Sequence, residues 1–426
     1  MTATAAPVRN AWRGVCAAAV LWSVAAGAQE VVADPLRRAA QEGDVPSQSL
    51  LADEFFFGRN GRQRNPTLAV FWYRRAAESG DAAAMYNLAV CLEHGWGTEA
   101  DRIGAFRYYT RAAGSVSDAR LRRALLLWSG IPDATEESGR KRPGIPADRA
   151  EALRELDALA ASGHAGARFE LASLLFNDSE LRASRGGELR LLLEPAAEAG
   201  DPAAMRMLAD CWRFGFGGGA DIHRARFWWE RAAEAGDPAA MVALAGALEF
   251  GQGGAPEPER AFEWIRRAAE AGNPRALVRL GEYHLQGDYT RHDPAAAVGC
   301  FQRALAAEEP SAATRLGDCA LHGIGMEPDP QRAAEFYGRA ARGGDPDGQF
   351  KFGRCYLDGT GMAADPVGAV FWFRRAAGRG QTEAMRELGL CLLSGRGVAR
   401  DEAEGSRLLQ AAASAGDAEA RLLLDR

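Results

Sequence analysis

Cysteine is the first residue type in this chain whose number and placement could carry chemistry. The chain has seven cysteines, and five of them recur at one position of a repeated helix: Cys91, Cys211, Cys319, Cys355 and Cys391. Packed helices lie about 8 to 10 Å apart, whereas a disulfide needs Cα atoms within about 7 Å of each other. We therefore expect these five to be buried thiols that act as small hydrophobic residues.

Histidine and serine give no catalytic or metal-binding pattern. The six histidines are His94, His164, His223, His284, His292 and His322. No His-x-x-x-His or Cys-x-x-Cys pair supplies the spacing of a metal site. Lys141 follows Ser138 by three residues, within the insertion at 131–147, but the Ser-Asp-Asn and Lys-Thr-Gly motifs that accompany a Ser-x-x-Lys nucleophile do not occur in the sequence. The sequence thus predicts no catalytic residue, no metal site and no cofactor.

The elements that must position any functional residue repeat along the chain. Gly200, Gly236 and Gly272 are 36 residues apart (236 − 200 and 272 − 236). A first helix, helix A, is predicted at Pro202–Phe214, where apolar residues recur at helical spacing. A Gly-x-Gly loop and a second helix, helix B, at about 222–235 complete a helical hairpin. About ten such units fit between residues 45 and 417.

Glycine, aspartate and proline punctuate the units. Gly-Asp-Pro at 200–202, 236–238 and 344–346 places a left-handed C-cap, an N-cap and a first-turn proline in succession. The Gly323-Ile324-Gly325 loop joins two helices and lacks the strand and lysine of a phosphate-binding loop. We expect these residues to be structural.

Aromatic triplets occur at a fixed place in helix B. They are Phe71-Trp72-Tyr73, Phe227-Trp228-Trp229 and Phe371-Trp372-Phe373. Stacking on a base or sugar would use such residues, but their fixed register indicates packing between helices. We expect a core role, with the third aromatic of each triplet partly exposed.

One unit carries the motif of a known family. Leu316-Gly317, Gly323-x-Gly325, Asp329, Ala333, Phe336-Tyr337 and Ala340-Ala341 resemble the Sel1-like repeat, a relative of the tetratricopeptide repeat. The resemblance implies an all-α fold, an α/α solenoid coiled as a right-handed superhelix of about ten helical hairpins. It covers residues 45–426, with an insertion at 131–147 that is rich in proline, glycine and charge.

Helix A lines the concave surface in tetratricopeptide units, so the same is implied here. The polar residues that interrupt its apolar stripe are then the candidate protein-binding residues: Asp53, Glu93, Arg206, Asp210, Arg213, Glu249, Glu282, Asp318, Arg354 and Arg386. Mixed charges along an extended groove suit a protein or peptide partner that carries both signs.

The N-terminus is predicted to direct export. Residues 1–28 combine Arg9 and Arg13, a short apolar stretch and a small-residue cleavage site before Gln29, as in a signal peptide. Residues 29–44 are expected to form a capping helix. After signal removal no segment is long and apolar enough to span a membrane. The expected location is the periplasm or the exterior.

Charge and motif content narrow the function. The net charge is −6 and the isoelectric point is near 5.7, which gives no basic field for nucleic acid. We expect an exported, non-catalytic scaffold for protein–protein interaction. One alternative is a cell-wall-active enzyme of the β-lactamase type attributed to a cysteine-rich branch of the family, although this chain lacks that branch's cysteine pair in each repeat. Another is a secreted effector or regulatory adaptor in envelope or host signalling.

Overall fold

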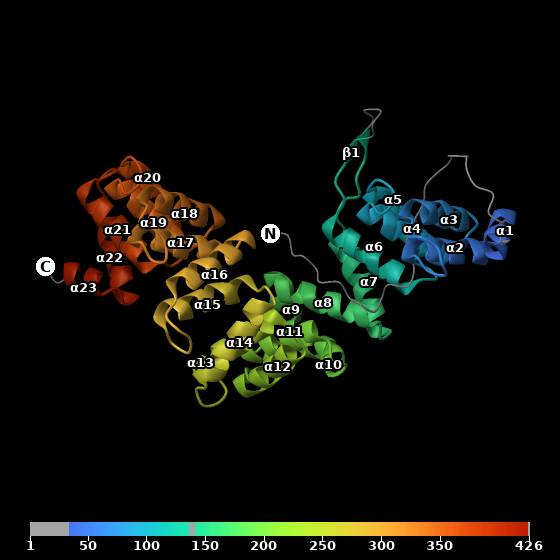
Figure 1. Ribbon diagram of the computed structural model, residues 1–426, viewed down its shortest axis with the longest axis horizontal. Coiled ribbons are helices and arrows are strands. Elements are labelled where there is room, and N and C mark those ends of the chain that lie inside the picture. The colour runs from blue at the N-terminus through green and yellow to red at the C-terminus, as the bar shows by residue number, and fades with distance from the viewer. Residues whose placement is uncertain (1–33, 136–140, 425–426) are drawn as a thin grey trace. The chain divides into compact units, whose positions relative to one another are not determined.

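Helical hairpins make up nearly all of the chain in the computed structural model, which describes residues 34–135 and 141–424 (Figure 1). The predicted signal peptide lies outside the described residues. The all-α fold class is confirmed. The chain divides into two compact units, residues 1–196 and 197–426, and each is described by itself.

The first unit holds α1 to α9 and most of α10. The bounds of its helices are α1 (Pro35–Glu42), α2 (Val45–Phe57), α3 (Pro66–Glu78), α4 (Ala82–His94), α5 (Arg102–Ala112), α6 (Ser117–Ser129), α7 (Arg149–Ala161), α8 (Ala165–Asn177), α9 (Ser179–Arg185), the 3-10 helix η1 (Gly186–Glu188) and α10 (Leu189–Glu198). Helix α1 packs on α2, and α2 to α8 pack in sequence order, each on the next.

The insertion forms a β-hairpin where the sequence predicted only a loop. Strands β1 (Ala134–Thr135) and β2 (Lys141–Arg142) pair antiparallel, and Ile131 and Ile145 exchange backbone hydrogen bonds of 2.7 and 2.8 Å at its base. An ion pair of 3.0 Å joins Arg142 to Asp101 at the start of α5. Figure 1 shows the hairpin extending away from α6 and α7.

The second unit is a regular run of six hairpins and a last helix. The bounds of its helices are α11 (Pro202–Phe214), α12 (Ile222–Glu234), α13 (Pro238–Glu249), α14 (Pro258–Glu270), α15 (Pro274–Gln286), α16 (Pro294–Ala306), α17 (Pro310–His322), α18 (Pro330–Gly343), α19 (Pro346–Asp358), α20 (Pro366–Ala377), α21 (Thr382–Ser394), α22 (Glu402–Ser414) and α23 (Ala418–Leu424). The odd-numbered helices α11 to α21 are helices A, and each packs on the helix B that follows it. From α13 on, each helix A also packs on the helix B that precedes it.

The predicted caps are confirmed. The carboxylate of Asp201 accepts from the backbone N–H of Ala204, and that of Asp345 accepts from Gly348, at 2.9 and 2.8 Å. These bonds satisfy N–H groups that the first turn of a helix leaves free. Helix α17 is an exception, because Glu309 precedes it and makes no side-chain cap bond.

A glycine lets each Gly-x-Gly loop touch the preceding unit. A Cβ on Gly361 would lie 1.9 Å from the carbonyl oxygen of Pro330, the first residue of α18, and the backbone φ of Gly361 is +72°. Both the close approach and the left-handed φ require glycine. The loop thereby fixes how α19 follows α18.

The aromatic triplets pack in a different order from the expected one. Tyr73, Trp229 and Phe373, the third residues, are fully buried. The first residues, Phe71, Phe227 and Phe371, are about half exposed. The third ring faces helix A of its own hairpin, as where Phe373 lies against Gly353. The prediction that these triplets pack in the core is therefore correct for the third residue. The prediction that the third residue is partly exposed was wrong, because it is the first residue that is exposed.

Candidate functional site

All ten predicted binding residues lie on helices A. Two are in the first unit, on α2 and α4, and eight are in the second unit, on α11, α13, α15, α17, α19 and α21. Most of them are engaged with other side chains of the chain itself. Those contacts place eight of them in three groups: carboxylates bonded to helix B aromatics, members of a row of alternating charges, and arginines that hold the next unit. Arg213 and Arg354 belong to none of the three.

The first group joins the two helices of a hairpin. Asp210 accepts a hydrogen bond of 3.1 Å from the indole N–H of Trp229, and Glu93 accepts one of 2.7 Å from the hydroxyl of Tyr109. Asp53 likewise accepts from the Tyr73 hydroxyl. Burial raises the pKa of Asp210 above its usual value, against the lowering effect of the bond from Trp229. These carboxylates satisfy buried donors that would otherwise destabilise the core.

The second group forms a row of alternating charges across four consecutive helices A of the second unit, which we name the charge ladder. Its members, in order, are Glu249, Arg279, Glu282, Arg315, Asp318 and Lys351. Arg279 lies 2.5 Å from Glu249 and 3.9 Å from Glu282. Arg315 lies 2.7 Å from Glu282 and 4.0 Å from Asp318. Lys351 ends the ladder 2.6 Å from Asp318.

The bases of the charge ladder are functional candidates that sequence reasoning missed. Arg279, Arg315 and Lys351 each precede a polar helix A position by three residues, which puts the two on the same face. In these three units only the later polar position, Glu282, Asp318 or Arg354, was taken as a candidate, which left the bases out. The recurrence of a base three residues before each of Glu282, Asp318 and Arg354 is the signal that could have found them.

The charge order reverses after the ladder. Arg354 on α19 lies 2.9 Å from Asp358 and 3.8 Å from Glu387 on α21. The base thus comes from the earlier helix and the acid from the later one, the opposite of Arg315 and Glu282. Arg354 is exposed and is the predicted residue that is most open to a partner at this end.

The third group connects one unit to the next. Arg386 is buried and lies 2.5 Å from Asp417, the aspartate that caps α23 through a bond from the Ala420 N–H. Arg206 similarly lies 3.2 Å from Asp237, the N-cap of α13. Burial alone would raise the pKa of Asp417, but the bonds from Arg386 and Ala420 hold it below its usual value. Both arginines reinforce the cap of the next helix A.

Arg213, the last of the predicted residues, covers an aromatic ring. Its guanidinium carbon lies 5.2 Å from the centroid of Phe214 and 5.7 Å from that of Trp229. Both distances are within the range of cation–π attraction.

A pocket of about 260 Å³ opens beside the start of the charge ladder. Its lining comes from the end of α13 and from α15: Glu249, Phe250, Arg279, Glu282, Tyr283 and Gln286. Two predicted residues, Glu249 and Glu282, are among them. Burial and the nearby Glu249 raise the pKa of the Tyr283 hydroxyl.

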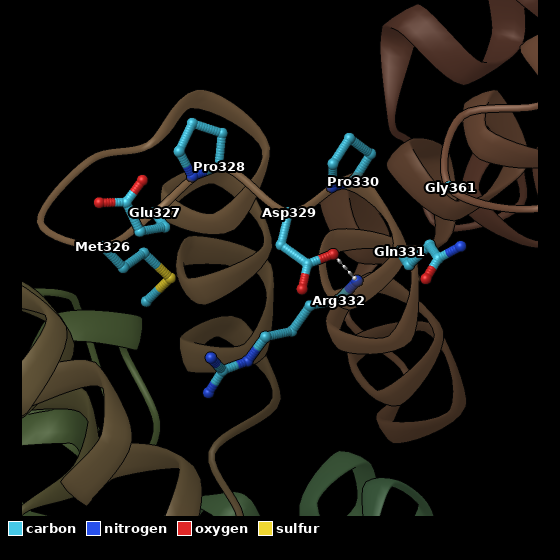
Figure 2. Close-up of a pocket in the computed structure, with 8 residues that line it drawn as sticks. All are labelled: Met326, Glu327, Pro328, Asp329, Pro330, Gln331, Arg332 and Gly361. Atoms are coloured by element: carbon cyan, nitrogen blue, oxygen red, sulfur yellow. Dashed lines mark hydrogen bonds between the residues drawn. The ribbon is translucent and has the colours of Figure 1, made fainter.

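A larger pocket of about 730 Å³ lies along the loop between α17 and α18 (Figure 2). It is lined by Met326 to Arg332 and by Gly361 of the next loop. The Asp329 carboxylate accepts from the backbone N–H of Arg332, as Figure 2 shows, and so serves as the cap of α18. The lining offers no cluster of groups for a reaction.

Two of the histidines have structural roles. His164 accepts from the Ala167 N–H and caps α8, and the ring of His94 stacks on Trp96 at 4.6 Å. Over residues 34–135 and 141–424, no group of three or more His, Cys, Asp or Glu side chains could hold a metal ion.

Comparison with known proteins decides the family. The Sel1 repeat matches residues 45–81, 82–114, 202–237, 238–273, 274–308, 310–345, 346–381 and 382–417, which is more than half of the chain. The chain belongs to the Sel1-repeat family. All ten predicted binding residues fall inside matched Sel1 repeats, and the β-hairpin falls between the second and third of them.

Two solved structures resemble the chain. A protective antigen present in uropathogenic Escherichia coli strains, which displays an SLR fold, gives a TM-score of 0.60 at 25% identity over 90% of this chain and 80% of that one. A Sel1 repeat protein from Oxalobacter formigenes gives a TM-score of 0.50 at 27% identity, with 62% of this chain and 99% of that one covered.

Curated relatives match over a short stretch. HRD3A of Arabidopsis thaliana, an ERAD-associated E3 ubiquitin-protein ligase component, is 36% identical over 92 residues, which is 22% of this chain and 13% of the relative. HRD3B of the same plant is 36% identical over 92 residues and 15% of its length. The chain therefore spans less than a sixth of either curated relative.

The cysteines of the Sel1 repeats agree with prediction except at one. Cys211, Cys319, Cys355 and Cys391 are buried, and burial raises the pKa of the Cys319 and Cys355 thiols to about 11. Cys91 is disulfide-bonded, so its prediction as a thiol was wrong. The argument from repeat spacing excludes only bonds between equivalent positions.

Among the described helices, none is both long and apolar enough to cross a lipid bilayer.

Proposed function

We propose that this Sel1-repeat protein is an exported scaffold without catalytic activity, which binds an extended segment of a partner protein along the helix A face of its second unit. The observation that carries the proposal is the charge ladder. Its six charges alternate in sign, come from four successive helices A and keep between 25% and 39% of their side-chain surface exposed.

The ladder contributes more to recognition than to stability. Ion pairs with this much exposure each add about 0.2–1 kcal/mol to the free energy of unfolding. They do, however, hold long side chains in fixed positions before a partner arrives. Binding of a partner then costs less side-chain entropy of this surface than it would if the surface were mobile. Alternating charge also favours a partner segment with the complementary order of charges and disfavours others.

The similarity to HRD3A supports a role in an assembly. That relative is named as a component of a ubiquitin ligase, and the 92 matched residues are the part that the two chains share. A segment shared with a component of a multiprotein complex is in keeping with a scaffold. The partner of this chain stays a separate question, because the match covers 13% of HRD3A.

Export rests on the pattern of residues 1–28. Mass spectrometry of the mature protein is expected to find its first residue at or near Gln29. An intact Met1 in a cytosolic fraction would contradict export. The absence of catalysis is tested separately, because hydrolysis of a chromogenic β-lactam by the pure protein would favour the cell-wall enzyme instead.

Partner capture tests the interaction surface. The tagged chain is crosslinked in its native host and compared with Arg315→Gln/Lys351→Gln, which removes two bases of the ladder. A matched control is Arg332→Gln/Arg342→Gln, which removes two exposed arginines of α18, a helix B. We expect a specific partner with the wild type and the control and its loss with the ladder variant, all three folding alike by circular dichroism. Equal capture by all three would place the binding surface elsewhere.

A further inference from the structure

The pocket beside the charge ladder has an exposed aromatic wall, Phe250. Phe250 follows the last residue of α13 and is 71% exposed. No cation and no second ring lies against it among the described residues, although most exposed phenylalanines of the chain have one. A ring this exposed contributes little to the stability of the free protein, and it stabilises a complex that buries it.

The preceding repeat shows what fits such a ring. Phe214 is 36 residues before Phe250 (250 − 214) and occupies the equivalent position of the repeat, as the last residue of α11. The guanidinium of Arg213 lies over it at 5.2 Å. In the repeat of Phe250, the residue that corresponds to Arg213 is Glu249. The cation is therefore missing, and a carboxylate stands in its place.

One carboxylate of the pocket, Glu249, can pair with a further cation. Two carboxylates, Glu249 and Glu282, share Arg279 as the only base that lines the pocket. Glu282 has a second base, because Arg315 lies 2.7 Å from it. Glu249 has Arg279 alone among the described residues. An arriving cation beside Glu249 would add a second ion pair without displacing Arg279.

The loop next to the pocket departs from the repeat. Tyr289 occupies the second glycine position of a Gly-x-Gly loop, with φ +59°, and is 47% exposed. The centroid of its ring lies 5.9 Å from that of Tyr283, which lines the pocket, and 6.1 Å from that of Phe262. A tyrosine in the left-handed region costs about 1 kcal/mol or more. The loop thereby places the exposed ring of Tyr289 beside the pocket.

We propose that this pocket binds an arginine side chain of the partner segment, with its guanidinium paired to Glu249 and stacked on Phe250. The inference rests on the proposed function only in that the arginine belongs to a partner protein. Arginine fits better than lysine, because its planar group can stack on a ring and pair with a carboxylate through two parallel N–H bonds. Arg213 over Phe214 is the intramolecular precedent.

Short peptides test the pocket without a partner. The probes are acetyl-Gly-Arg-Gly-amide, its lysine analogue and its citrulline analogue, which keeps the shape of arginine but lacks the charge. Binding to the full chain is followed by saturation-transfer NMR of the peptide. We expect saturable binding of the arginine peptide, and binding about tenfold weaker for the citrulline peptide, since both the ion pair and the cation–π contact are lost.

Two variants locate the binding. Phe250→Ala removes an exposed side chain and is expected to weaken arginine binding severalfold, and Glu249→Gln to weaken it similarly. Phe371→Ala is the matched control, an exposed ring that Arg375 already covers at 5.8 Å; it is expected to leave binding unchanged. Equal binding of the citrulline peptide, or equal binding by Phe250→Ala and the wild type, would overturn the inference.

The outcome is separable from that of partner capture. If the wild type binds the arginine probe at Phe250 but captures no partner, the scaffold proposal fails and the arginine site stands. If a partner is captured through the ladder while the probe does not bind, the arginine site fails and the scaffold stands.

Discussion

Small residues on helix A decide how closely each hairpin can pack. Gly353 on α19 faces the fully buried ring of Phe373 on α20, and a Cβ at Gly353 would lie 2.7 Å from Cε1 of that ring. Gly246 on α13 is also a helical glycine, but a Cβ there would meet nothing within 4 Å. The sequence predicts both as helix positions, and only the packing of the hairpin distinguishes them.

Alanine substitution is expected to separate these two glycines. Gly353→Ala should lower the free energy of unfolding by about 1–3 kcal/mol, because the ring of Phe373 must move in a packed core. Gly246→Ala should raise it by up to about 1 kcal/mol, the helix propensity gained. Urea unfolding followed by circular dichroism measures both. A shift in the same direction for the two variants would contradict the packing argument.

Asp210 illustrates a residue whose role the sequence could not give. It was predicted as a groove residue, because a polar side chain interrupted an apolar stripe. The structure adds that its carboxylate accepts from Trp229 on the opposite helix. Periodicity shows the face of a helix on which a residue lies, but not whether a neighbouring side chain binds it.

The pH dependence of stability tests Asp210. Burial raises its pKa in the folded state above its usual value, so its charged form destabilises the fold at neutral pH and protonation relieves that effect. Asp210→Asn keeps an oxygen acceptor for Trp229 without the charge. Its melting temperature relative to the wild type should therefore be higher at pH 7 than at pH 3. Asp210→Ala, which leaves the indole N–H unpaired, should lose about 1–3 kcal/mol. A relative melting temperature of Asp210→Asn that does not change with pH would contradict this assignment.

At the scale of elements, caps and loops were predicted well, because their signals are local. The Gly-Asp-Pro junctions end one helix and begin the next within three residues, and the structure confirms them. The charge ladder was not predicted as a set. Arg315 and Glu282 are 33 residues apart (315 − 282), and their contact depends on how one hairpin packs on the next.

The Gly-x-Gly loop offers a test of that packing between hairpins. Gly361 and Gly380 both have a positive φ, +72° and +85°, but only Gly361 approaches the preceding unit closely. Alanine at either position should cost about 1 kcal/mol or more for the left-handed backbone. Gly361→Ala should cost about 1–3 kcal/mol beyond that, since its Cβ would collide with the carbonyl of Pro330. Amide hydrogen exchange should show faster opening of α18 and α19 in this variant alone. Similar losses in the two variants would mean that the approach of the loop does not matter.

At the scale of the whole molecule, the sequence predicted the kind of architecture but not its division. The repeat of 36 residues predicted hairpins throughout residues 45–417, and the structure forms them. The matched Sel1 repeats, however, leave residues 115–201 unmatched, and the division into two compact units falls within that stretch. A periodic pattern shows that units follow one another. It does not show where the chain divides into compact units, because that depends on irregular segments such as α9, η1 and α10.

The proposed binding surface is likewise a property of several units together. Each Sel1 repeat supplies one or two charges, and only their succession over α13, α15, α17 and α19 forms the ladder. The interpretation of the chain as a scaffold depends on a partner lying along these helices rather than along the helices B behind them.

Site-specific photo-crosslinking in the native host tests most directly whether a partner binds the helix A face. A benzophenone amino acid replaces Gln286, which lines the pocket on α15, or Glu335, which is exposed on α18. The scaffold account predicts that the Gln286 position forms an adduct with a specific partner protein and that the Glu335 position does not. An adduct with the same partner from Glu335 but not from Gln286 would contradict it, because the partner would then bind the helix B face.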